Sequence, residues 1–96
     1  MIVNNLLTHM NDAKAQGLLP RFAATEDYGS ARFTRKDAPR VWVTHYDGID
    51  RDHPEHYAIY RALQEIPVGR MPWTVDNCRV GKANELSKAL ELALAE

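Results

Sequence analysis

The sequence predicts an α+β fold, a single small domain with a mainly antiparallel sheet and helices packed on one of its faces. Three observations predict this class. Amphipathic helical patterns stand near both ends of the chain, short alternating segments separated by turn residues occupy the region 21–46, and a length of 96 residues suits one domain. The expected order of elements is α-β-β-β-α-β-α, within one domain over residues 1–96.

The first helix is predicted by apolar residues at helical spacing. Gly17 follows these residues and is a suitable end for the helix, and Pro20 prevents it from continuing. The apolar series is Val3, Leu6, Leu7, Met10 and Ala13.

Strands are predicted next, at residues 21–25, 31–35 and 40–46, with turn-forming residues between them. The segment 40–46 is the strongest of these, because β-branched and aromatic residues fill it. Its side chains alternate between two faces, and periodicity alone leaves open which face is buried. One face carries Val41, Val43 and His45, and the other carries Trp42, Thr44 and Tyr46.

The remaining predicted elements are two helices and a strand. A second helix is expected to begin at Asp52, because Glu55 follows at the spacing of a capping box and Pro54 falls in the permissive first turn. Residues 73–80 are expected to form a further strand, and a helical stripe of apolar residues predicts a last helix near the C-terminus. The second helix would bury Tyr57, Tyr60, Leu63 and Ile66, and the last would bury Leu86, Ala89, Leu90, Ala93 and Leu94.

The composition is that of an ordinary globular protein. There are 12 basic and 13 acidic residues, for a formal net charge of −1, and 45% of residues are hydrophobic. This balance argues against a strongly basic nucleic-acid arm and against a polyanionic mimic of DNA. The single cysteine, Cys78, allows no internal disulfide, and the first residues lack the pattern of a signal peptide. We therefore expect a cytoplasmic protein that does not enter a membrane.

The densest polar cluster spans residues 45–56 and contains three of the four histidines. Imidazole and carboxylate groups are ligands for zinc and other divalent ions, so a metal-dependent hydrolase built on His45, Asp50, His53 and His56 is one alternative. However, the spacing matches neither the H-E-x-x-H motif nor a calcium loop. The sequence favours a polar loop that leads into a capped helix, and we assign no metal and no cofactor.

A basic and aromatic stretch covers residues 20–42, where five basic residues face three acidic ones. An open sheet face that carries arginines and aromatic rings can bind single-stranded nucleic acid by stacking and by phosphate contacts. A small nucleic-acid-binding domain that uses the surface of residues 21–42 is therefore the main alternative. The charge surplus is small, which limits the expected affinity for phosphates. The aromatic residues of this stretch are Phe22, Tyr28, Phe33 and Trp42.

Residues 43–66 have the opposite balance, with five acidic residues and two basic ones. Separate patches of opposite charge suit a protein interface. No catalytic signature accompanies them: Cys78 is expected to be buried in a strand, and no serine lies in a G-x-S-x-G motif.

The leading interpretation is a non-enzymatic module that binds another protein. It would act as a regulator or inhibitor that docks on a larger complex, a role common among the small accessory proteins of phages and mobile elements. The sequence does not distinguish a monomer from a dimer. The candidate partner-binding residues are Arg32, Arg35, Arg40, Trp42, Tyr46, Asp50 and Asp52.

Overall fold

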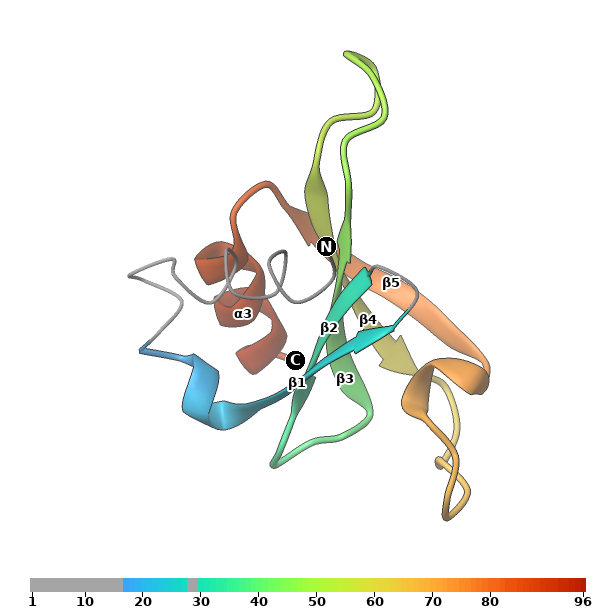
Figure 1. Ribbon diagram of the computed structural model, residues 1–96. Helices are drawn as coiled ribbons and strands as arrows, with labels where there is room; N and C mark the ends of the chain where they lie inside the picture. Colours follow the sequence, from blue (N-terminus) through green and yellow to red (C-terminus); the bar gives the residue numbers. More distant parts are fainter. Residues whose placement is uncertain (1–16, 28–29) are drawn as a thin grey trace.

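Each strand of the protein pairs with the strand that precedes or follows it in the sequence. The computed structural model describes residues 17–27 and 30–96, and within them five strands form an antiparallel sheet in the order β1-β2-β3-β4-β5 (Figure 1). The first predicted helix, with its apolar series from Val3 to Ala13, lies outside the described residues. The strands are β1 (Phe22–Asp27), β2 (Ser30–Arg35), β3 (Val41–Tyr46), β4 (His56–Ala62) and β5 (Asn77–Ala83).

The main core lies between one face of this sheet and the helix α3 (Leu86–Leu94), which covers it (Figure 1). Phe33, Val43 and Ile59 stand side by side across three neighbouring strands, and each is 0% exposed. Burying a side chain of this size contributes roughly 1.5–3 kcal/mol. The helix contributes the predicted apolar stripe, of which Leu86, Ala89, Leu90 and Ala93 are buried.

A smaller core lies on the opposite face. Trp42 is 1% exposed there and stacks on Tyr60, with 5.8 Å between the ring centroids. The segment between β4 and β5 covers the indole, because Ile66, Trp73 and Val75 belong to the same cluster. The sheet is therefore buried on both faces near Trp42. The alternation of β3 left open which of its two faces is buried, and the structure shows that both are.

The predicted second helix is wrong. Residues 56–62 form β4, which pairs with β3 from Tyr46↔His56 to Val41↔Arg61. The physical reason is that both faces of β4 are covered: Tyr57 and Ile59 join the main core, while Tyr60 packs beside Trp42. Apolar residues on both faces remove the simple alternation that marks a half-buried strand, so the segment also matches a helical spacing.

The other predicted elements are confirmed in part. Strands occur at the positions of the first three predicted strands, and the last helix occurs as α3. β5 begins at Asn77 rather than at residue 73, because residues Pro72–Thr74 form the short 3-10 turn η2. A second 3-10 turn, η1 (Leu19–Arg21), precedes β1. None of the helices in the described residues has the length and apolar character needed to cross a membrane.

Candidate functional site

The hairpin between β3 and β4 projects well beyond the sheet (Figure 1, top). β3 ends at Tyr46 and β4 begins at its partner His56, so residues 47–55 form the projection, which we call the arm. About two residues are enough to join antiparallel strands. The remaining residues of the arm are not needed to connect the two strands. Long ordered loops of this kind commonly carry function.

The tip of the arm is held by Asp50. Its Oδ1 accepts hydrogen bonds from the backbone N–H groups of Asp52 and His53, both at 2.9 Å, and lies 3.0 Å from His53 Nδ1. The N–H of Ile49 also donates to the carbonyl of His53 at 2.9 Å. These contacts form an Asx-type turn that restrains the backbone of the tip.

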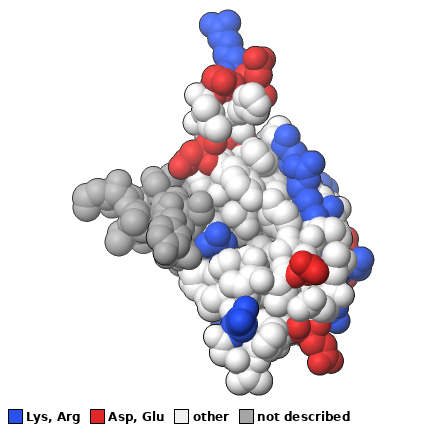
Figure 2. Space-filling model, turned by 90° about the vertical axis from the view of Figure 1, so that its right-hand side faces the viewer, with Lys and Arg blue, Asp and Glu red and all other residues white. Residues whose placement is uncertain are grey.

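The exposed surface of the arm is acidic, with one large apolar side chain, that of Ile49. Figure 2 shows Asp and Glu side chains gathered along the projection, with a basic side chain at its far end. Arg51 is the single Lys or Arg of the arm, and Ile49 is 83% exposed. The exposed acidic residues are Asp47, Asp50, Asp52 and Glu55.

A histidine and two carboxylates meet at the root of the arm. His45 lies near the end of β3, is 2% exposed and packs against Tyr57, with 5.0 Å between the ring centroids. Its Nε2 lies 3.2 Å from Oε2 of Glu55 and 3.8 Å from Oδ1 of Asp47. Gly48 permits this convergence, because a Cβ there would lie 3.1 Å from the backbone nitrogen of Glu55.

On the other face of the sheet, the root carries aromatic rings. Tyr46 is 39% exposed and stacks on His56, with 5.1 Å between the centroids. Its hydroxyl lies 2.7 Å from that of Tyr60. Burial, and then the hydrogen bond with Tyr46, raise the pKa of Tyr60 to about 12. The contacts with His56 and Tyr60 hold the partly exposed ring of Tyr46 in place beside the arm.

The histidines selected from the sequence are not brought together. His53 contacts Asp50 at the tip, whereas Nδ1 of His56 lies 3.1 Å from the carbonyl of Pro54. His45 instead meets Asp47 and Glu55, which sequence reasoning did not select. The alternation of an extended chain places residues 45 and 47 on the same side, and this is the signal in the sequence that could have pointed to Asp47. Finding Glu55 also requires the register between β3 and β4, which brings residue 55 opposite.

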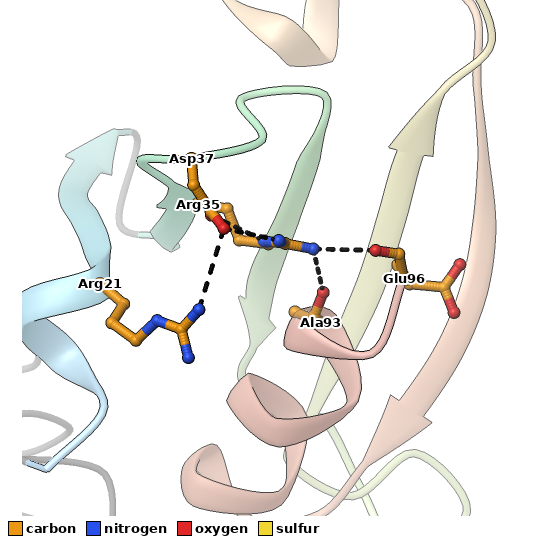
Figure 3. A network of polar contacts seen from close by, with 5 residues as sticks. All are labelled: Arg21, Arg35, Asp37, Ala93 and Glu96. Atoms are coloured by element: carbon orange, nitrogen blue, oxygen red, sulfur yellow. Dashed lines mark hydrogen bonds and ion pairs between the residues drawn. The ribbon is translucent and has the colours of Figure 1, made fainter.

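Arg35 is part of the framework that joins the sheet to the end of the chain (Figure 3). It is 8% exposed and donates to the carbonyls of Ala93 and Glu96, at 3.1 and 2.9 Å. It also donates two hydrogen bonds to the carboxylate of Asp37, which lower the pKa of Asp37 and raise that of Arg35. A cation at the C-terminal end of α3 also complements the helix dipole.

The other candidates from the basic stretch also contact the fold. Trp42 is in the core, Arg40 donates to the carbonyl of Ala62 at 3.2 Å, and the guanidinium of Arg32 lies 4.4 Å from the centroid of the Trp73 ring. The nucleic-acid alternative needs exposed aromatic rings on this surface, and Phe22, Phe33 and Trp42 are buried. Tyr28 lies outside the described residues.

Of the partner-binding candidates, Asp50 and Asp52 lie at the tip of the arm, and Tyr46 lies at its root. The arrangement offers an exposed acidic surface for a basic partner and a histidine–carboxylate cluster that could hold a cation. No protein-family model matches the chain, and neither curated proteins nor solved structures give a match. The function is therefore inferred from these residues alone.

Proposed function

We propose that the protein is a non-enzymatic binding module that inserts its arm into a basic surface of a partner protein. In this role it regulates or inhibits a larger complex. The observation that carries the proposal is the arm itself: residues 47–55 project from the sheet, every residue in the range is exposed, and the tip is restrained by Asp50.

Restraint and charge together favour a docking role. A loop that is already ordered loses less conformational entropy on binding than a flexible one. The carboxylates of the arm would attract a basic partner, speed its approach and fix its orientation. Ile49 supplies the apolar contact, because burying an isoleucine side chain contributes roughly 1.5–3 kcal/mol.

The charge of the arm favours a protein over a nucleic acid. Acidic side chains repel phosphates, and nucleic-acid affinity depends on the number of phosphates that basic residues neutralise. Arg35 and Arg40 are engaged with Asp37 and with backbone carbonyls. A nucleic-acid-binding domain is therefore the less supported alternative.

The test is affinity capture from a lysate of the source cells, with and without nuclease, read by quantitative mass spectrometry. The arm variant is Ile49→Ser with Asp52→Asn. Its matched control is Leu63→Ser with Glu91→Gln, since Leu63 is also an exposed apolar residue, at 58%, and Glu91 is exposed on α3. Both variants should keep the wild-type circular dichroism spectrum.

The expected result is a protein partner that survives nuclease, is retained by the control and is lost by the arm variant. Its binding should weaken with added salt, because exposed charges are screened. A partner that the arm variant retains would contradict the proposal. Capture that disappears on nuclease treatment would also contradict it and would favour the surface of residues 21–42.

A further inference from the structure

We propose that the root of the arm is a binding site for a divalent transition-metal ion, with zinc as the best fit. The protein ligands are Nε2 of His45 and one carboxylate oxygen each from Asp47 and Glu55. The metal site goes beyond the proposed partner binding and is tested separately from it: the metal test alters Asp47 and Glu55 at the root, whereas the docking test alters Ile49 and Asp52.

The spacing of the three groups suits a metal ion. All three ligand atoms lie within 4.8 Å of one another. Zinc binds nitrogen and oxygen ligands at about 2.0–2.2 Å, so ligand atoms around a tetrahedral ion are roughly 3.4 Å apart. The distances from His45 Nε2 to Glu55 and to Asp47, 3.2 and 3.8 Å, lie on either side of this value.

The burial of His45 is a second, independent observation. Carboxylates at a surface are common, but this imidazole is 2% exposed and directs Nε2 toward both of them. The ring is already held in place on β3 against Tyr57, so binding an ion would not cost the conformational entropy of fixing it. An imidazole ligand favours zinc, copper or nickel over magnesium and calcium, which prefer oxygen ligands alone.

The arm provides both the second side of the site and the path to it. Asp47 leaves β3 and Glu55 leads into β4, and the close approach at Gly48 keeps the two segments together. The side chains of Asp47 and Glu55 are 68% and 55% exposed, which gives an ion access from solvent. A bound ion would join the outgoing and returning segments of the arm at its root.

The experiment measures zinc binding to the full chain after removal of metals with a chelator. Zinc chloride is titrated by calorimetry and in competition with a chromophoric chelator, and cobalt chloride provides a visible absorption spectrum that reports the ligands. The test variants are Glu55→Gln and Asp47→Asn. Asp52→Asn is the matched control, because it removes the same charge from the same arm outside the cluster.

The expected result is one zinc ion per chain. Each test variant should weaken binding by roughly tenfold or more, whereas the control should stay close to wild type. Zinc should also raise the unfolding midpoint of the wild type, because a ligand that binds only the folded state stabilises it. The variants alter exposed side chains, so we expect them to fold like the wild type. Circular dichroism verifies this.

Three outcomes would overturn the proposal. One is the absence of stoichiometric zinc binding, and another is an equal loss of affinity in the Asp52→Asn control. The third is loss of binding in a His53→Ala variant that matches the loss in Glu55→Gln, because His53 lies at the tip beside Asp50.

Discussion

Arg35 donates a hydrogen bond to the backbone carbonyl of Glu96 at 2.9 Å, across 61 positions of the sequence. The same guanidinium donates to Ala93 and to Asp37, so one side chain joins β2, the β2–β3 turn and the end of α3. The main core already packs α3 on the sheet. Arg35 adds hydrogen bonds that hold the C-terminal end of α3 beside β2.

Replacing Arg35 with alanine should lower the free energy of unfolding by about 2 kcal/mol, because it removes several hydrogen bonds from a charged, buried donor. Lys36→Ala should have little effect, since Lys36 is the exposed neighbour. Urea denaturation of both variants measures the difference. Equal midpoints for the two variants would show that the Arg35 contacts do not stabilise the fold.

The contribution of Asp37 should depend on pH. Its pKa is lowered in the folded state, chiefly by its hydrogen bonds with Arg35. A lowered folded pKa gives stability that is present above the unfolded pKa, near 3.9, and is lost as pH falls through the folded pKa. The difference in unfolding free energy between wild type and Asp37→Asn should therefore shrink between pH 5 and pH 2. A difference that stays constant over this range would contradict the assignment.

Tyr60 should titrate with a pKa of about 12, above its ordinary value of 10.0. Burial is the larger cause and the Tyr46 hydroxyl the second, so Tyr46→Phe should lower this pKa without restoring the ordinary value. Because the folded pKa is raised, the associated stability is present below pH 10 and is lost as pH rises toward 12. NMR of ring-labelled tyrosine follows each of the four tyrosines separately. An unchanged Tyr60 titration in Tyr46→Phe would exclude the contribution of the hydroxyl pair.

Trp42→Ala should destabilise the protein by about 3–5 kcal/mol, because it leaves a cavity in the smaller core. Trp73→Ala should cost less, since Trp73 is only half-buried and packs at the edge of the same cluster. Chemical denaturation monitored by circular dichroism allows the two variants to be compared directly. A smaller loss for Trp42 than for Trp73 would contradict the packing described for this face.

The sequence predicted those elements whose pattern of residues lies within the element itself or in the turns beside it. β1, β2, β3 and α3 each have an apolar series or flanking turns that predict them. β4 was missed because its two covered faces hide the alternation, and the cover of Trp42 was missed because the segment after β4 has no periodic pattern. The burial of both faces of β3 depends on these distant residues.

The candidate site shows the same division between local and distant information. The density of polar residues in the sequence pointed to the region 45–56, which contains the arm and the His45 cluster. The choice among its histidines required the cross-strand register, because only the pairing of β3 with β4 brings Glu55 beside His45. A spacing pattern in one segment does not contain that register.

The arm is also structurally separate from the core of the fold. Every residue from 47 to 55 is exposed, and the core clusters draw on none of them. Substitutions, insertions or grafted peptides beyond Gly48 should therefore leave the sheet folded, because exposed loop tips tolerate such changes. The hairpin is therefore a suitable position for displaying designed binding loops on an unchanged scaffold.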